Sequence, residues 1–417
     1  MYKRMKFILI CMMFFQGVIF AQGVVDQVNT LPGLGKLKST QYAGYSNGIF
    51  YWYIASVKND KNKPIIIWTS GGPGTSSLYG LFEENGPYQC ALHKKNKPVF
   101  SRVRNYRDWS RFSNYLVFDQ PLGVGLSFAS KNKFPKTPLD GNIQYYQALK
   151  DFFNKHPALK KHDIYLAGES YGGTYMALLA QSILHDKSNT LKLKGIIIIS
   201  GWVAPKLQYK SMPYFVYNHG LIDKSNFIIS QSLYQGCYTC DNRIRDCYQV
   251  CNKVDNYISD VSGMDLHDIA SNNLDSNWKK GGWINCLNSN VTRRDIHANI
   301  KGVYVPMTNI WDLYGKSQLN SVLPIYKKII SNNVKLLVIS GLNDGSPSGY
   351  LGARLWLRAL DKNYNNFKQE KWLIDKKLLG YKVKISNQIL WVKVLNAGHT
   401  VPTYQPLISN LVKNFIN

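Results

Sequence analysis

Residues 168–172 read Gly168-Glu169-Ser170-Tyr171-Gly172, a G-x-S-x-G sequence that directly follows the apolar run at residues 163–167. A helix-like stretch follows the second glycine at once. A strand, a tight glycine turn and a helix in this order are what a nucleophile elbow requires, because the turn holds the serine hydroxyl above the edge of a sheet. The same pattern also occurs in ordinary turns, so its context must support it. The hypothesis that it raises is acyl transfer through an ester of Ser170.

Two later loops supply the partners that a serine nucleophile needs. The apolar run at residues 334–340 leads to Asp344, and the run at 389–395 leads to His399. Taken singly, an aspartate there is typical of a turn and a histidine of a surface loop. Their order after the serine, each beyond the carboxyl end of a strand, is that of an α/β-hydrolase. We therefore expect His399 to take the proton of Ser170 and Asp344 to orient the imidazole.

Strand-like and helix-like segments alternate along most of the chain. The strand-like segments are residues 65–68, 115–118, 163–167, 194–200, 334–340 and 388–395. The helix-like segments include residues 143–155, 174–185, 350–360 and 406–415. This alternation predicts an α/β fold of the α/β-hydrolase type, with a mostly parallel central sheet covered by helices on both faces. Residues 201–283 break the pattern, and we expect a cap subdomain inserted at about residues 202–285 of a single domain that spans residues 23–417.

The N-terminus has the pattern of a secretory signal peptide at residues 1–22. Basic residues come first, an apolar run fills residues 7–20, and Ala21 is a small residue suited to cleavage. An uncleaved anchor is the alternative. Because no second long apolar run follows, we expect no stable membrane anchor after the signal is removed. The expected location is the secretory pathway, ending in a lysosome-like or vacuole-like compartment or outside the cell.

Six cysteines remain if Cys11 leaves with the signal peptide. An even number of cysteines in an exported chain indicates disulfides. The close spacing of four of them favours a nested arrangement, which pairs Cys237 with Cys251, Cys240 with Cys247 and Cys90 with Cys286. Six cysteines allow fifteen pairings, so others stay open. A zinc site in the four-cysteine cluster is the alternative hypothesis, and oxidising export disfavours it.

The net charge of +26 could indicate nucleic acid or an anionic surface as a partner. The basic residues are scattered, however, and no arginine-rich helix or nucleic-acid motif accompanies them. We therefore interpret the charge as a compositional bias and expect no nucleic-acid partner. The sequence Asn290-Val291-Thr292 is a glycosylation sequon, so Asn290 is a candidate for a glycan.

Further segments surround the three candidate catalytic residues. They read LPG at residues 31–33, QYAGY at 41–45, WTSGGPGTSS at 68–77, ENGP at 84–87, VFDQPLGVGLS at 117–127 and AGHTVP at 397–402. Together with the elbow, these segments resemble the serine carboxypeptidases, a family of secreted, lysosomal and vacuolar α/β-hydrolases. The resemblance covers nearly all of the chain after the signal peptide and is weakest between about residues 208 and 283.

The resemblance implies an enzyme that releases the C-terminal residues of peptides and proteins at acid pH, with no cofactor and no metal. Its oxyanion hole would consist of backbone N–H groups of Tyr171 and Gly72. Tyr171 is assigned because it follows the nucleophile, whereas Gly72 is assigned by the resemblance alone. Whether such a protein forms a homodimer stays open.

The resemblance also assigns recognition of the substrate carboxylate to Glu84 and Glu169, with Ser70 and Trp68. Two carboxyl groups can bind a carboxylate only if they hold protons, and crowded, partly buried carboxyl groups have raised pKa values. Acid conditions would therefore favour binding. The alternatives are turn capping or a salt bridge for the glutamates, and a place in the core for Trp68.

Three residues depart from the family pattern. Ser70 stands where the family usually has asparagine, Thr75 replaces a cysteine, and Leu342 replaces an aspartate. Since Ser70 affects a carboxylate donor, two alternatives to peptide hydrolysis remain. One is transfer of acyl groups to small alcohols by the same serine, and the other is a non-catalytic protective or binding subunit.

Overall fold

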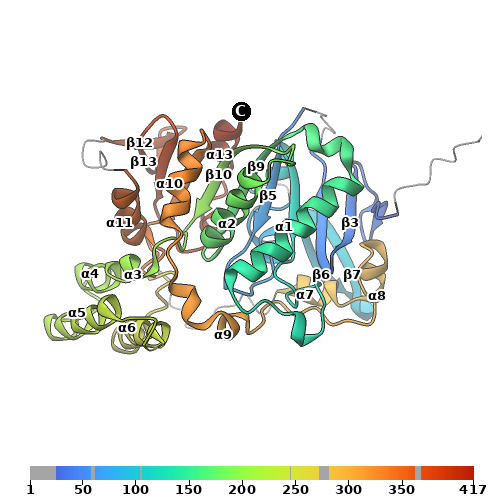
Figure 1. Ribbon diagram of the computed structural model, residues 1–417. Coiled ribbons are helices and arrows are strands. Elements are labelled where there is room, and N and C mark those ends of the chain that lie inside the picture. The colour runs from blue at the N-terminus through green and yellow to red at the C-terminus, as the bar shows by residue number, and fades with distance from the viewer. Residues whose placement is uncertain (1–24, 58–61, 104–105, 245, 272–280, 362–367) are drawn as a thin grey trace, which may run out of the picture.

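The computed structural model describes residues 25–57, 62–103, 106–244, 246–271, 281–361 and 368–417, so the expected signal peptide lies outside the described residues. Within them a ten-stranded sheet forms the centre of the molecule (Figure 1). Its strands in spatial order are β12 (Gln369–Ile374), β13 (Lys377–Lys384), β14 (Ile389–Val394), β11 (Lys335–Gly341), β10 (Lys192–Ile199), β9 (Asp163–Glu169), β5 (Ile65–Thr69), β8 (Asn114–Phe118), β4 (Ile49–Ile54) and β3 (Gln41–Ser46). Strands β14 to β8 in this order run parallel, and each end of the sheet is completed by antiparallel strands. This confirms the predicted fold class.

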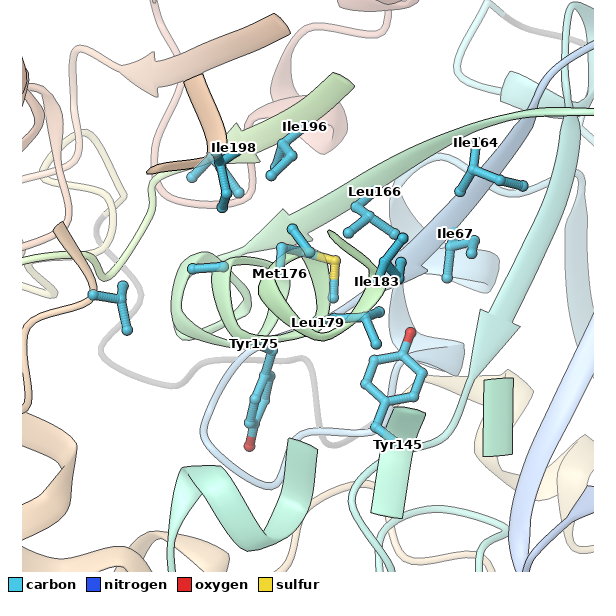
Figure 2. Close-up of a cluster of buried hydrophobic side chains, with 14 of the residues drawn as sticks. Ile67, Tyr145, Ile164, Leu166, Tyr175, Met176, Leu179, Ile183, Ile196 and Ile198 are labelled. Atoms are coloured by element: carbon cyan, nitrogen blue, oxygen red, sulfur yellow. The ribbon is translucent and has the colours of Figure 1, made fainter. Parts of the chain in front are cut away.

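Both faces of the parallel strands are buried, which explains their continuous apolar sequences. In β10, Ile196 and Ile198 pack on one face of the sheet, and Ile197 and Ile199 pack on the other. The first face is covered by α1 (Pro138–Lys155), α2 (Gly172–His185), α10 (Leu323–Ser331) and α11 (Tyr350–Leu360). The second is covered in part by α13 (Ile408–Ile416). Figure 2 shows side chains of α2 packed on those of β9 and β10 in the first layer.

The helix expected at residues 143–155 begins five residues earlier, at Pro138. The side chain of Thr137 accepts a hydrogen bond from the backbone N–H of Asp140, and proline occupies the first helical position. Both features favour a helix start. The polar residues of this first turn obscured it in the sequence.

The sheet also has edges that the sequence analysis did not predict. Strands β3 and β4 form one edge, and the lysine-rich hairpin of β12 and β13 forms the other. Lysines on an edge strand discourage pairing with another chain. The basic residues between 371 and 377 thus lie at an edge of the main sheet.

The remaining elements are short. They are β1 (Thr30–Leu31), β2 (Gly35–Lys36), η1 (Gly80–Glu84), β6 (Tyr88–His93), η2 (Lys94–Asn96), β7 (Lys97–Arg102), η3 (Trp109–Arg111), η4 (Lys131–Lys133), η5 (Pro157–Lys161), α8 (Asn290–Asp295), α9 (Ile310–Tyr314), η7 (Gly315–Leu319) and α12 (Val401–Tyr404). Asn290 is exposed at the start of α8, as a glycan would require, and its glycosylation stays a prediction.

Between β10 and β11 the chain leaves the sheet. It first forms α3 (Pro205–Gln208), α4 (Ser211–Asn218), α5 (Lys224–Thr239) and α6 (Cys247–Ser262), which surround a hydrophobic cluster of their own. Figure 1 shows α4, α5 and α6 projecting at one end of the molecule. The following helix, α7 (Gly282–Leu287), lies instead beside β6 and β7. The segment expected as a cap, residues 202–285, thus divides between two places.

Three disulfides are present among the described residues. They join Cys90 to Cys286, Cys237 to Cys251, and Cys240 to Cys247. These are the nested pairs that the spacing favoured, so the four-cysteine cluster has no free thiolates for zinc. Two of the bonds tie the end of α5 to α6, and the third ties β6 to α7. In the part of the chain that the structure describes, no helix combines the length and the apolar character needed to cross a membrane.

The buried face of β10 provides a test of the core. Ile198 is fully buried, whereas Ile228 on α5 is 56% exposed. We expect Ile198→Ala to lower the free energy of unfolding by about 3 kcal/mol, because it leaves a cavity in the core. The matched control, Ile228→Ala, should change it by less than about 0.5 kcal/mol. Urea unfolding of both variants measures the difference, and equal effects would contradict the assignment of this layer to the core.

Candidate active site

The carboxyl ends of the parallel strands bring the expected catalytic residues to one edge of the sheet. Ser170 follows β9, Asp344 follows β11 and His399 follows β14. Parallel strands end at the same edge, so loops that are distant in sequence meet there. Ser170 and His399 line one cavity of about 1410 Å³ at this edge, and Asp344 lies behind the histidine.

Ser170 occupies the strained position of a nucleophile elbow. Its φ angle is +56°, in the left-handed region that residues with a side chain rarely adopt. Its backbone N–H donates to the carbonyl of Ile199 (2.9 Å), and its carbonyl accepts from Trp202 N–H (2.8 Å). A methyl group at Gly168 would lie 2.6 Å from the carbonyl oxygen of Gly172. The turn therefore closes only because the residue at position 168 has no side chain.

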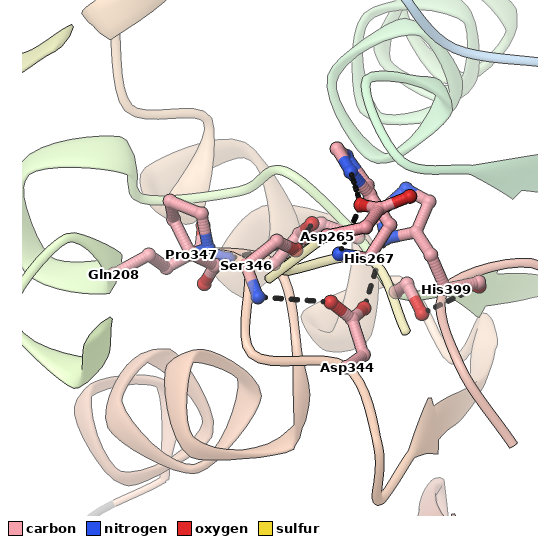
Figure 3. A network of polar contacts seen from close by, with 10 residues as sticks. Gln208, Asp265, His267, Asp344, Ser346, Pro347 and His399 are labelled. Carbon is pink, nitrogen blue, oxygen red and sulfur yellow. Dashed lines mark hydrogen bonds and ion pairs between the residues drawn. The ribbon is translucent and has the colours of Figure 1, made fainter. Parts of the chain in front are cut away.

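His399 and Asp344 form a hydrogen-bonded pair (Figure 3). The Nδ1 atom of His399 lies 2.8 Å from Oδ2 of Asp344. The second carboxylate oxygen of Asp344 accepts from the backbone N–H of Ser346 (3.0 Å). The Asp344 side chain is fully buried and that of His399 is 11% exposed. The aspartate is thus held on both oxygens, and the other imidazole nitrogen, Nε2, is left for another partner.

The cap region contacts His399 directly, which the sequence analysis did not anticipate. The backbone N–H of His399 donates to the carbonyl of His267 (2.7 Å), and the two rings meet edge to face with 4.8 Å between their centres. His267 Nδ1 lies 3.1 Å from Oδ1 of Asp265 (Figure 3). Although the side chain of His267 is 64% exposed, the surrounding protein removes part of its hydration, which opposes its charge. The hydrogen bond to Asp265 and the nearby charge of Asp344 outweigh this effect and raise the pKa of His267. A second histidine–carboxylate pair therefore lies against the first.

The glycine loop after β5 packs against the elbow. A methyl group at Gly71 would lie 2.6 Å from the backbone nitrogen of Tyr171 and 2.7 Å from Cβ of Ser170. Gly72 follows with φ +106°, and both Gly72 and Tyr171 line the cavity. Tyr171 immediately precedes α2, where backbone N–H groups lack partners within the helix. The two backbone groups expected to form the oxyanion hole are therefore brought to one place.

Asp119, whose role the sequence analysis missed, holds this loop in position. One of its carboxylate oxygens accepts from the backbone N–H of Ser77 (3.1 Å), and the other accepts from that of Leu126 (2.6 Å). The hydroxyl of Ser77 in turn accepts from the backbone N–H of Ser70 (3.2 Å). Burial raises the pKa of Asp119 to about 7. Asp119 belongs to the VFDQPLGVGLS segment at residues 117–127. The sequence analysis therefore identified this segment but assigned no role to its aspartate.

Glu84 and Glu169 lie next to each other beneath the cavity. Both side chains are almost completely buried, and only Glu169 reaches the cavity wall. Burial raises the pKa of both carboxyl groups, and the charge of Glu84 raises that of Glu169 further. Among the described residues, both oxygens of Glu84 and one of Glu169 have no hydrogen-bond partner of good geometry. The pair can thus hold a proton at a pH where exposed glutamates are ionised.

The other two candidates for carboxylate recognition differ in position. Ser70 lines the cavity, and its buried hydroxyl has no partner among the described residues. Trp68 is fully buried in the second core layer, edge to face with Trp109, and does not line the cavity. Trp68 thus has the core position that was the alternative, and a role of its indole in recognition stays a prediction.

Further cavity residues come from the cap and from the segments that follow it. They include Trp202, Tyr209, Asp255, Asp265, His267, Trp311 and Asp312. No motif marked them. Trp202 lies just beyond β10, but the other residues lie in segments that lack the strand-then-loop pattern of the expected catalytic residues.

The sequence of this chain is similar to those of known proteins. A family model described as serine carboxypeptidase matches residues 32–417. Serine carboxypeptidase ctsa-4.1 of Caenorhabditis elegans is 28% identical over 99% of this chain and 98% of its own length. Carboxypeptidase Y homolog A of Podospora anserina is 30% identical over 89% of this chain and 71% of its own. The lysosomal protective protein of Mus musculus is 31% identical over 58% of this chain and 52% of its own.

A solved structure shows the same fold. Kex1(Δ)p, a prohormone-processing carboxypeptidase from Saccharomyces cerevisiae, superposes with a TM-score of 0.81, over 94% of this chain and 95% of its own, at 20% sequence identity.

The close contact at Gly71 gives a test of the site geometry. Gly71→Ala places a methyl group against the elbow, so we expect a loss of serine reactivity of at least about tenfold, together with a lower melting temperature. Labelling with a fluorophosphonate and thermal unfolding measure the two effects. Gly236→Ala, in open space on α5, is the control. It should leave labelling unchanged and stabilise the helix by about 0.5–1 kcal/mol. Normal labelling of Gly71→Ala would contradict the contact.

Proposed function

The chain belongs to the serine carboxypeptidase family, and from that premise we propose that it releases the C-terminal residue of peptides through an acyl-enzyme formed on Ser170, at acid pH. The observation that carries the proposal is the His399–Asp344 hydrogen bond of 2.8 Å beside the elbow of Ser170, within one cavity. No step of this chemistry requires a cofactor or a metal.

The proposed reaction begins at the hydroxyl of Ser170. With Nδ1 of His399 donating to Asp344, Nε2 accepts the serine proton while Oγ bonds to the carbonyl carbon of the last peptide bond. The backbone N–H groups of Gly72 and Tyr171 stabilise the oxyanion, by about 3 kcal/mol for a single donor. Nε2 then gives the proton to the leaving nitrogen. Water, deprotonated by the same histidine, attacks the ester and restores the serine.

Restriction to the C-terminus follows from the carboxyl pair below the cavity. The substrate carboxylate would lie against Glu169 and Glu84, with the unpartnered hydroxyl of Ser70 as a further donor. An ionised pair would repel this carboxylate, whereas a protonated pair donates hydrogen bonds to it. Because burial raises both pKa values, the pair keeps its protons in mildly acidic solution.

The proposed setting is an acidic compartment of the secretory pathway. Support comes from the N-terminal signal pattern, from three disulfides among the described residues, and from a relative named for the lysosome. The partners would be the C-termini of peptides and proteins in that compartment.

Replacing the nucleophile tests the reaction. Ser170→Ala should lower kcat by at least about 10⁴-fold while the melting temperature stays unchanged, because only the attacking oxygen is lost. The assay is release of the terminal amino acid from a blocked dipeptide at about pH 5. Ser232→Ala, an exposed position on α5, is the control and should keep full activity.

A fluorophosphonate separates the alternatives. Labelling that depends on Ser170, together with peptide cleavage, supports the proposal. Labelling without cleavage would favour acyl transfer to an alcohol. The absence of Ser170-dependent labelling would favour a non-catalytic subunit.

The carboxyl pair predicts a pH dependence in substrate binding. The raised pKa values mean that the protonated, binding-competent form prevails at low pH and is lost as pH rises through them. KM should therefore increase by at least about tenfold between about pH 5 and 8. Glu169→Gln keeps a neutral donor, so its KM should vary much less with pH. Glu370→Gln, on the exposed edge strand β12, should behave as the wild type. A flat KM profile for the wild type would refute this role.

A further inference from the structure

The cavity differs in charge from the rest of the protein. The chain has 51 lysines and arginines against 25 aspartates and glutamates. No lysine or arginine is found among the described residues that line the cavity, whose basic members are His267 and His399. Besides Glu169, which is protonated in mildly acidic solution, the acidic residues there are Glu83, Asp255, Asp265, Asp268 and Asp312. In a strongly basic protein, this concentration of carboxylates in a substrate cavity indicates attraction of positive charge.

Asp255 on α6 and Asp312 on α9 belong to a wall that starts beside the nucleophile. Trp202 donates its backbone N–H to the carbonyl of Ser170 (2.8 Å), so this wall begins next to the serine. Burial raises the pKa of the Tyr209 phenol, and the charge of Asp255 raises it further. The carboxylate of Asp255 therefore lies close to the ring of Tyr209. Trp202, Tyr209, Asp255 and Asp312 thus form one wall, which runs from Ser170 toward the cap.

A buried polar group behind this wall has no hydrogen-bond partner among the described residues. Tyr248 is 2% exposed, and its hydroxyl has no hydrogen-bond partner in the described part of the chain. Burial, followed by the charges of Asp255 and Asp312, raises its pKa, so the hydroxyl lies close to both carboxylates. Tyr248 does not itself line the cavity, so it lies behind the wall to which Asp255 and Asp312 belong.

Aromatic rings complete the wall. The rings of Trp202 and Tyr209 meet edge to face with centres 5.7 Å apart, and those of Tyr248 and Trp311 meet similarly at 5.1 Å. The indole of Trp202 is fixed by a hydrogen bond to the carbonyl of Gln318 (2.9 Å). Aromatic faces attract cations, and the aliphatic stem of lysine or arginine packs against such rings while its charged end reaches carboxylates.

The position of this wall relative to Glu84 and Glu169 determines which residue of the substrate contacts it. The terminal carboxylate would lie against Glu84 and Glu169, where the charges of both act on Tyr79. The terminal residue therefore occupies the space between Ser170 and that pair. The wall from Trp202 toward the cap is left for the residue on the acyl side of the scissile bond.

Resting on the proposed function, we propose that Trp202, Tyr209, Asp255, Trp311 and Asp312 bind the side chain of the penultimate residue and select lysine or arginine there. The substrate class is thus peptides with a basic residue next to the C-terminal one. The carboxylates pair with the cation, and the rings pack on its stem.

The first test compares blocked dipeptides that share one terminal residue and carry lysine, norleucine or glutamate before it. Norleucine has a similar stem without the charge. We expect kcat/KM at about pH 6 to be at least about tenfold higher for lysine than for norleucine, and lowest for glutamate. Equal or better cleavage of the norleucine peptide would overturn the proposal while leaving the carboxypeptidase function intact. Absence of Ser170-dependent cleavage of all three would overturn both.

The second test uses variants that remove charge without changing size. Asp255→Asn and Asp312→Asn should each reduce the lysine-to-norleucine ratio of kcat/KM several-fold, and the double variant should bring it close to one. Cleavage of the norleucine peptide should stay within about twofold of the wild type. Asp260→Asn, exposed on the same helix as Asp255, is the matched control and should leave the ratio unchanged. An unchanged ratio in the double variant, or an equal loss on both peptides, would overturn the assignment.

Discussion

Close approach of backbones at one edge of the sheet is the constraint on which the site depends. A methyl group at Gly71 would lie 2.6 Å from the nitrogen of Tyr171, and one at Gly341 would lie 2.1 Å from the carbonyl oxygen of Gly398. One at Gly398 would lie 2.6 Å from the carbonyl oxygen of His267. The loops after β5, β9, β11 and β14 are therefore packed backbone against backbone, without side chains between them. These contacts fix Ser170 relative to the glycine loop after β5, and His399 relative to the end of β11.

Most of the sheet and the catalytic loops were predictable because each has a local signature. Parallel strands are buried on both faces, so they appear in the sequence as short apolar runs such as residues 194–200, and the loops beyond them carry Ser170, Asp344 and His399. The spacing of the cysteines likewise indicated the disulfide pairs, because α5 and α6 are adjacent in both sequence and space. The strands, the loops beyond them and the disulfide pairs could thus be predicted because each depends on residues that are close together in the sequence.

The rest depends on contacts between distant segments. Nothing near His267 in the sequence shows that its ring will lie against His399, because the two residues meet only through packing of the cap. Asp119 was visible within a motif, but its function appears only in its hydrogen bonds to the glycine loop. Trp68 shows the reverse, since a residue of the recognition segment proved to be core. The hairpin of β12 and β13 was missed because exposure and lysines make its sequence polar, whereas β4 was missed although its six residues are all buried.

The disulfide between Cys90 and Cys286 has a consequence for the covalent topology of the protein. It closes a loop with a sequence separation of 196 residues, which contains the nucleophile and helices α3 to α6. The acid and the histidine lie outside this loop, on the C-terminal side. If a protease cut the backbone once at any point within the loop, the two resulting polypeptides would stay joined through sulfur. A cut between Ser170 and Cys286 would leave Ser170 on one chain and Asp344 and His399 on the other, within one covalent molecule.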